Sequence, residues 1–165
     1  MQEHFLNSSF REKLIEHLFV GELLKLAWST QDFSFEISKP EVDNAGYDVI
    51  IEAKNVLRHI QLKSAFVGSS TSVQKINIAL ERKPSGCVVW VYFNPETLQL
   101  GPFLFFGSTA GEPLPDLSNY KIAKHTKGDA DGYKAERPNI RQINKGSFLV
   151  INDIKHLYQK LFIRD

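Results

Sequence analysis

The fold is decided by residues 46–63, which read GYDVIIEAKNVLRHIQLK. Two β-rich runs in this stretch flank Lys54-Asn55, a pair typical of a tight turn. With a two-residue turn, Asp48 lies opposite Gln61 on the neighbouring strand. Side chains alternate between the two faces of a sheet, so Lys63 shares the face of Gln61. The stretch therefore predicts a hairpin that gathers three polar groups, whereas a loop one residue longer would turn Gln61 to the other face.

The residues before this hairpin predict one helix and one strand. Apolar residues recur at helical spacing from Phe10 to Trp28, and most charged residues lie off that stripe. The candidates for the helix N-cap are Asn7, Ser8 and Ser9. A short β-like run at 33–38 makes the hairpin part of a three-stranded meander.

The residues after the hairpin predict a second helix and a buried pair of strands. The helix starts in the Ser/Thr cluster 69–72, whose hydroxyls suit a helix N-terminus, and it stops before Pro84. The continuously apolar run 88–93 is typical of a central strand, and 98–106 pairs with it. Few regular elements are expected from 107 to 145, before a strand at 148–151 and a closing helix at 153–162.

Length and composition predict one globular domain spanning residues 1–165. Apolar residues make up 42% of the chain and charged residues 24%, which is ordinary material for a packed core. The order of the elements predicts an α/β fold with a mixed central β-sheet flanked by helices. We expect a core at about 10–105, a basic, loop-rich segment at 107–146, and a closing strand and helix at 147–163.

The sequence also predicts a cellular location. No apolar stretch reaches the length that spans a membrane, and the polar start Met1-Gln2-Glu3-His4 lacks the pattern of a secretion signal. The single cysteine, Cys87, has no second cysteine to pair with, and it precedes an apolar run that indicates a small buried hydrophobe. We therefore expect a cytoplasmic protein without a membrane partner.

Glu22 is the most informative oddity of the first helix. It follows Leu18 by four residues and precedes Leu26 by four, which predicts a carboxylate on the helix face that enters the core. A buried carboxylate needs a charged partner, a metal or a strong hydrogen-bond donor. The alternative is a glutamate at the edge of the stripe that reaches solvent or pairs with Lys25.

The polar groups of the hairpin suit phosphodiester hydrolysis. This reaction requires an activated water, relief of negative charge at phosphorus and support for the leaving oxygen, and a divalent cation contributes to all three. Mg²⁺ prefers hard oxygen ligands and keeps several waters, so one or two carboxylates with an amide or a backbone carbonyl suffice to hold it. A neighbouring lysine, such as Lys63, orients the water and stabilises charge on the phosphate.

These residues resemble the PD-(D/E)XK nuclease superfamily. Glu22 on the first helix, Gly46-Tyr47-Asp48 entering one strand and Gln61-Leu62-Lys63 in the next form an E…GxD…QxK variant of its motif. Two positions depart from the common pattern, since Tyr47 replaces the proline and Gln61 replaces the more frequent acid. The glutamine removes one negative charge, which weakens cation binding.

The resemblance implies a restriction-endonuclease-like fold with an αβββαβ core and a metal-dependent nuclease activity. It implies that Asp48 and Gln61 ligate Mg²⁺, that the Leu62 carbonyl supplies a further ligand, and that Glu22 completes the site. Lys63 is then the catalytic lysine, and Mn²⁺ is expected to replace Mg²⁺. The expected substrate is nucleic acid, with DNA favoured, and a homodimer is expected where both strands are cut.

The basic segment offers candidates for nucleic-acid contact. Residues 1–118 contain 10 Lys or Arg against 14 Asp or Glu, whereas residues 119–146 contain 7 against 3. Such a segment suits a phosphate backbone, or it is a solvated loop. The individual candidates are His59, Ser70, Lys75, Lys124, Arg137 and Arg141. His59 alternatively stacks within the sheet, and the Ser70 cluster alternatively caps a helix.

Two other functions compete with catalysis. A non-cleaving nucleic-acid-binding or regulatory member of the same fold is suggested by Gln61. A protein-interaction subunit of a defence or mobile-element system is suggested by the aromatic strand Phe103-Leu104-Phe105-Phe106, which faces either a partner or the core.

Overall fold

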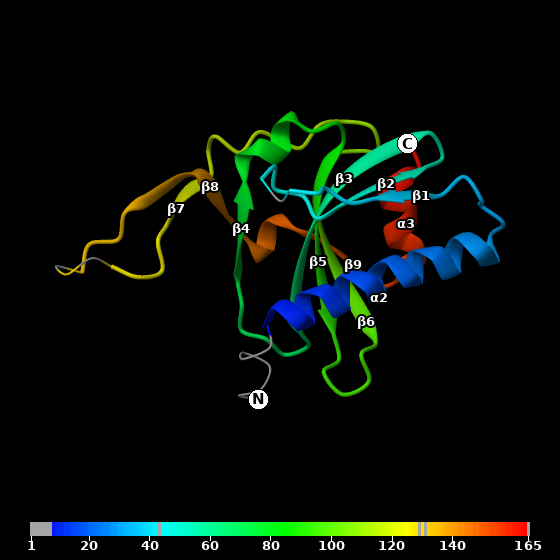
Figure 1. Cartoon of the computed structure of the whole chain (residues 1–165), viewed down its shortest axis with the longest axis horizontal. Coiled ribbons are helices and arrows are strands. Elements are labelled where there is room, and N and C mark those ends of the chain that lie inside the picture. Colours follow the sequence, from blue (N-terminus) through cyan, green and yellow to red (C-terminus); the bar gives the residue numbers. More distant parts are fainter. Residues whose placement is uncertain (1–7, 43, 129, 131, 165) are drawn as a thin grey trace.

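A six-stranded mixed sheet forms the centre of the computed structural model, which describes residues 8–42, 44–128, 130 and 132–164. Its strand order is β1-β2-β3-β5-β6-β9 (Figure 1). The strands are β1 (Glu36–Ser38), β2 (Val49–Ala53), β3 (Val56–Phe66), β5 (Gly86–Phe93), β6 (Leu100–Gly107) and β9 (Leu149–Ile151). β3 and β5 pair in parallel, and the other neighbours pair in antiparallel. The expected mixed α/β architecture is therefore confirmed.

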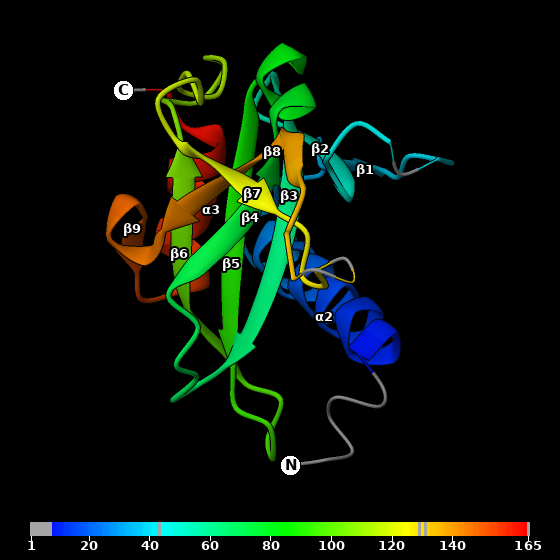
Figure 2. The ribbon, with the colours of Figure 1, turned by 90° about the vertical axis from the view of Figure 1, so that its left-hand side faces the viewer.

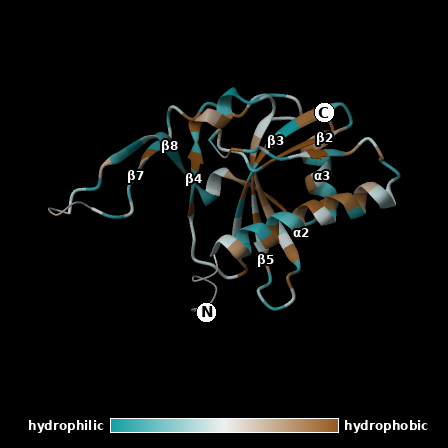
Figure 3. Ribbon diagram, viewed as in Figure 1, coloured by the Kyte–Doolittle hydropathy of each residue, from teal (hydrophilic) through white to brown (hydrophobic). Residues whose placement is uncertain are grey.

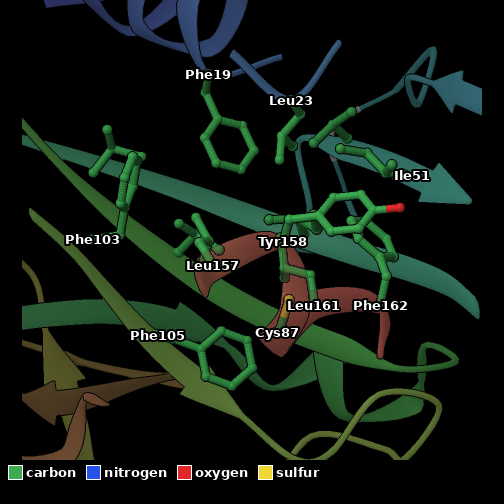
Figure 4. Packing of buried hydrophobic residues seen from close by; sticks show 14 of the residues in the cluster. Phe19, Leu23, Ile51, Cys87, Phe103, Phe105, Leu157, Tyr158, Leu161 and Phe162 are labelled. Carbon is green, nitrogen blue, oxygen red and sulfur yellow. The ribbon is translucent and has the colours of Figure 1, made fainter. Parts of the chain in front are cut away.

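Two helices of the described chain, α2 (Ser8–Ser29) and α3 (Ile154–Phe162), cover one face of this sheet. Phe19 and Leu23 of α2 and Leu157 of α3 are fully buried against strand residues such as Ile51 (Figure 4). The first and last predicted helices are thereby confirmed. None of the described helices is both long and apolar enough to cross a membrane.

A second, three-stranded sheet covers the opposite face. Its order is β4-β8-β7, with β4 (Val73–Asn77), β7 (Lys121–Lys124) and β8 (Glu136–Asn144). Together with the 3₁₀ helix η1 (Ile78–Arg82) it buries a second core around Trp90, to which Ile76, Leu80 and Ile143 contribute. A short 3₁₀ turn, η2 (Lys145–Ser147), then leads to β9. The molecule therefore has three layers, which are helices, main sheet and small sheet.

The hairpin has the predicted register. Val49 lies opposite Ile60 and Ala53 opposite Val56, so the loop contains two residues. Lys54 and Asn55 have φ values of 50° and 59°. Two positive φ angles are what a type I′ turn requires, and this turn matches the twist of the paired strands. The prediction that the run 88–93 forms a central strand is also confirmed, because β5 lies between β3 and β6. All its residues are buried, since its side chains alternate between the core under the helices and the core under the small sheet.

Two sequence-based expectations for the chain after the hairpin are wrong. The helix expected after residues 69–72 is instead the strand β4 followed by η1. β4 is extended because it pairs with β8 and buries Ile76, and η1 begins where the Asn77 side chain accepts a hydrogen bond from the Ala79 amide at 3.0 Å. The segment 107–145, expected to hold few regular elements, contains both β7 and β8. β8 pairs with β4, more than sixty residues earlier in the chain, and a local sequence pattern does not reveal such a pairing.

A buried polar contact fixes α3 to the loop that follows α2. The Tyr158 hydroxyl donates a hydrogen bond to the Asp32 carboxylate, which also accepts one from the Ser34 hydroxyl at 2.7 Å. Lys54 lies 3.4 Å from the same carboxylate. The hydrogen bonds from Tyr158 and Ser34, with help from Lys54, lower the pKa of Asp32 to about 2. The contact therefore links the helical layer to the hairpin end.

Candidate functional site

A cleft of about 740 Å³ lies where β2 begins and β3 continues beyond it. One wall is the hairpin, a second is the N-terminal part of α2, and a third is β4. The lining residues are Asp48, Gln61, Leu62, Lys63 and Ser64 of the hairpin, Ser9, Arg11, Glu12, Lys13, Ile15 and Glu16 of α2, and Val73, Gln74 and Lys75 of β4. Four of them are Lys or Arg and three are Asp or Glu.

Asp48 is held by the backbone of the facing strand. Its amide donates to the Ile60 carbonyl at 2.9 Å, and its carboxylate Oδ2 accepts from the Leu62 amide at 2.7 Å. Asp48 lies just before the first residue of β2, and there its side chain takes the place of a backbone carbonyl in pairing with β3. In an antiparallel strand the N–H and C=O of one residue point to the same neighbour. The Leu62 carbonyl is therefore directed to the edge where Asp48 lies.

Gln61 and Lys63 join Asp48 at this cleft, as the hairpin register predicted. The Gln61 amide oxygen Oε1 is buried and has no hydrogen-bond partner among the described residues. A buried acceptor without a partner costs about 1–3 kcal/mol. A cation or a hydrogen-bond donor bound in the cleft removes that cost, which makes Gln61 the most informative residue of the site.

Glu22 does not occupy the position expected from the sequence. Its side chain is 38% exposed and forms a 2.9 Å ion pair with Lys25, and it is not among the residues that line the cleft. The expectation of a core-facing carboxylate is wrong. The buried stripe of α2 runs through Ile15, Phe19 and Leu23, one residue away from the stripe on which Glu22 lies. The alternative of a stripe-edge glutamate paired with Lys25 is the observed one.

Two other helix carboxylates, Glu12 and Glu16, line the cleft and were missed by sequence reasoning. Glu16 is buried and forms ion pairs with Lys13, at 3.0 Å, and with Lys39. Burial acts to raise the pKa of Glu16, but the hydrogen bonds and charges of Lys39 and Lys13 outweigh it, and the net pKa is lowered. Glu16 is therefore a paired anion, whereas Glu12 is exposed to the cleft.

His59 is part of the sheet rather than of the cleft. It is 7% exposed, its Nδ1 lies 2.8 Å from the Pro84 carbonyl, and its ring meets that of Tyr47 edge to face. Burial lowers the pKa of His59, and the nearby charge of Lys83 adds to this, against the opposite effect of the Pro84 hydrogen bond. The structure thus gives His59 the stacking role and not the contact with phosphate.

The other candidates for nucleic-acid contact lie in three places. Lys75 lines the cleft from β4. Lys124 and Arg137 are exposed on β7 and β8, and Arg141 is half-buried on β8 with its guanidinium donating to the Pro138 carbonyl at 2.6 Å. Ser70 lies in the loop between β3 and β4 and begins no helix, so the expectation of a helix N-terminus there is wrong.

The oxygen atoms that could act as metal ligands in the cleft suit a hard divalent cation. Within the described part of the chain no group of three or more His, Cys, Asp or Glu residues is placed to hold a metal. The candidate ligands are instead one carboxylate, from Asp48, with the unpartnered Gln61 amide oxygen and the Leu62 carbonyl. All three are oxygens, which Mg²⁺ and Mn²⁺ accept in preference to softer metals.

No family model and no curated protein matches this chain. Function is therefore inferred from the chemistry of the cleft and from the position of the elements that build it.

Proposed function

We propose that this chain is a metal-dependent nuclease domain of the PD-(D/E)XK class that hydrolyses phosphodiester bonds in DNA. The observation that carries the proposal is the convergence of Asp48, the unpartnered Gln61 oxygen and Lys63 on one cleft. Gln61 is decisive because a buried amide oxygen without a donor is costly unless a ligand occupies the cleft.

The order of the elements supports the proposed restriction-endonuclease-like core. A helix, a three-stranded antiparallel meander and a strand parallel to the third, namely α2, β1, β2, β3 and β5, follow one another as in an αβββαβ arrangement. The departure is the connection from β3 to β5, which contains β4 and η1 in place of an α-helix. This connection supplies the wall of the cleft that carries Gln74 and Lys75.

The residues of the hairpin have different roles in the proposed reaction. Asp48, Gln61 and the Leu62 carbonyl would hold Mg²⁺, which when bound supplies Lewis-acid activation of water and neutralises charge at phosphorus. Lys63 is a cation on the same strand, where it orients the attacking water and stabilises the charge that gathers on the phosphate oxygens. Lys75, on the opposite wall, holds the phosphate of the substrate against these groups.

The charge of the cleft predicts how metal and substrate bind. Asp48 is the one carboxylate that the hairpin contributes to the cleft, so affinity for the cation alone is weak. The cleft is lined by four Lys or Arg residues and three Asp or Glu residues, so a small excess of positive charge attracts the phosphate backbone. Because Mg²⁺ is commonly completed by substrate phosphates, we expect metal and nucleic acid to bind cooperatively.

Cleavage of supercoiled plasmid DNA tests this proposal. The purified chain should nick the plasmid with Mg²⁺ or Mn²⁺ and not with chelator. Asp48→Ala and Lys63→Ala should each lower the rate by about a hundredfold or more. The matched controls Asp116→Ala and Lys155→Ala remove the same charges at exposed positions outside the cleft and should leave the rate unchanged. Equal rates for all four variants would overturn the assignment.

A binding-only member of the same class is the second candidate. It is favoured by Gln61, which stands where an acid would add a second charged ligand. Salt-dependent binding of DNA with no cleavage across several divalent metals would select it. The third sequence-based alternative loses its basis, because the strand Phe103 to Phe106 is at most 5% exposed and packs in the core.

A further inference from the structure

β7 and β8 form a two-stranded antiparallel ribbon, residues 121–144, that we call the basic ribbon. It projects from the body on the side where α2 begins, and it points toward the viewer in the turned view (Figures 1 and 2). At its base Ala123 is fully buried, whereas nearly all described residues from Lys124 to Asn139 are exposed. The outer part therefore contributes little to either core.

The charge of the basic ribbon is positive. Residues 121–144 contain six Lys or Arg and three Asp or Glu, and hydrophilic colour covers much of the ribbon in Figure 3. The cations occur on both strands and on the connection between them. They are Lys121, Lys124, Lys127, Lys134, Arg137 and Arg141. A projecting element with few apolar contacts and this excess of cations is suited to a polyanion.

The ribbon is fixed in relation to the cleft. β8 pairs with β4 from Asn144 opposite Val73 to Ile140 opposite Asn77. Val73, with the two residues that follow it, lines the cleft. β4 thus forms one wall of the cleft and also holds the ribbon through β8, so a long polyanion bound to the ribbon can continue into the cleft.

We propose that the basic ribbon binds duplex DNA, with its two strands entering the major groove and its Lys and Arg side chains on the flanking phosphates. This inference rests on the proposed function in naming DNA as the substrate of the cleft, and it goes further in assigning the duplex form. The major groove of B-DNA is about 12 Å wide and admits a two-stranded ribbon. Contacts from the ribbon would hold the duplex so that one of its backbones reaches Lys75 and Lys63.

Two features of the ribbon argue against other nucleic acids. Proteins that bind single strands stack successive bases on several aromatic rings, and the ribbon contains one Phe, Trp or Tyr residue, Tyr133, besides the imidazole of His125. Double-stranded RNA has a deep, narrow major groove that side chains cannot read. Six cations with few stacking rings therefore match the phosphates and the open groove of a DNA duplex.

Binding without metal tests the ribbon separately from cleavage. The whole chain, in chelator, is titrated with a fluorescent DNA duplex of about 20 base pairs, two helical turns, over a range of NaCl concentrations. The ribbon variant is Lys127→Ala/Arg137→Ala. The matched control, Lys25→Ala/Lys155→Ala, removes the same charge from exposed positions on α2 and α3. Single-stranded DNA and duplex RNA of the same sequence serve as comparison ligands.

The wild type and the control should bind duplex DNA with the same affinity and salt dependence. The ribbon variant should bind more weakly, and the slope of log K against log[NaCl] should become shallower by about 0.9 for each phosphate that is no longer neutralised, or about 1.8 for two. An unchanged slope and affinity for the ribbon variant would overturn the inference. So would binding of single strands or duplex RNA as tight as that of duplex DNA.

The result is separable from the proposed nuclease activity. Ribbon-dependent binding without cleavage in the plasmid assay would contradict catalysis and leave the ribbon's role supported. Cleavage that depends on Asp48, with binding that is insensitive to the ribbon variant, would contradict the ribbon alone.

Discussion

Replacement of Arg58 should destabilise the fold strongly, although the residue touches no substrate site. Arg58 is fully buried on β3. Its Nε donates to the Leu161 carbonyl at 2.8 Å, and its Nη2 donates to the carbonyls of Ser108 at 3.0 Å and Lys160 at 3.3 Å. The guanidinium thus closes the last turn of α3, where helix carbonyls lack partners of their own. Burial lowers the pKa of Arg58 from its usual value.

The magnitude follows from these bonds. Hydrogen bonds from charged donors contribute about 1.5 kcal/mol or more each, so the two shortest, to Leu161 and Ser108, amount to about 3 kcal/mol. Arg58→Met keeps most of the side-chain volume but leaves both carbonyls without a donor. Removing the buried charge acts in the other direction, and we expect a net loss of about 2–3 kcal/mol. That is a large fraction of the roughly 5–15 kcal/mol that stabilises a typical domain.

Urea unfolding followed by far-ultraviolet circular dichroism measures this loss. The control is Arg82→Met, since Arg82 is exposed and its loss should change the free energy of unfolding by less than about 0.5 kcal/mol. A loss within about 1 kcal/mol of zero for Arg58→Met, or an equal loss for the control, would refute the role given to these hydrogen bonds.

Three further predictions concern stability at acidic pH, metal binding in the cleft and the turn that precedes β2. The pKa of Asp32 is lowered to about 2, so its contribution is present above its ordinary value of 3.8 and is lost as the pH falls through about 2. Protonation of Asp32 should therefore lower the free energy of unfolding of the wild type by about 2 kcal/mol between about pH 4 and pH 2. Asp32→Asn should lack this decrease in denaturant titrations, and an unchanged pH dependence would contradict the prediction. Gln61→Glu adds a charged ligand and should tighten Mn²⁺ binding about tenfold by calorimetry, whereas Gln99→Glu, at an exposed position, should not. Gly46→Ala should destabilise by more than about 1 kcal/mol, because Gly46 has a φ of 76° and an added Cβ would lie 2.7 Å from the Asn77 Cβ; a neutral change in melting temperature would show that the turn relaxes.

The hairpin was predictable because its information is local. Alternation of apolar residues, a two-residue turn and the register that follows from it all lie within residues 46–63. The same local rule brought Asp48, Gln61 and Lys63 to one face. The long apolar run of β5 and the helical spacing of α3 were likewise clear from the sequence.

Which carboxylate of α2 is buried was not predictable in the same way. α2 has apolar residues over much of its circumference, including Leu18 and Leu26, so the sequence does not fix which stripe faces the sheet. A shift by one residue moves the buried carboxylate from Glu22 to Glu16. The ion pair of Glu16 with Lys39 links positions on different elements, and nothing in the local sequence signals it.

The small sheet escaped prediction for a related reason. β4 reads VQKIN and β8 reads ERPNIRQIN, and neither run is apolar enough to indicate a strand by itself. They are strands because they pair with each other across more than sixty residues and cover Trp90. This pairing also joins the basic ribbon to the cleft, so the most function-relevant arrangement in the second half comes from the tertiary fold.

Diffraction from crystals soaked in Mn²⁺ tests the central claim most directly. Anomalous scattering locates the cation without reference to any assay. We predict a Mn²⁺ ion bound by the Asp48 carboxylate and the Gln61 amide oxygen, and its loss in Asp48→Ala crystals. A cleft without Mn²⁺ at concentrations that saturate other sites, or a cation bound away from Asp48 and Gln61, would contradict the account.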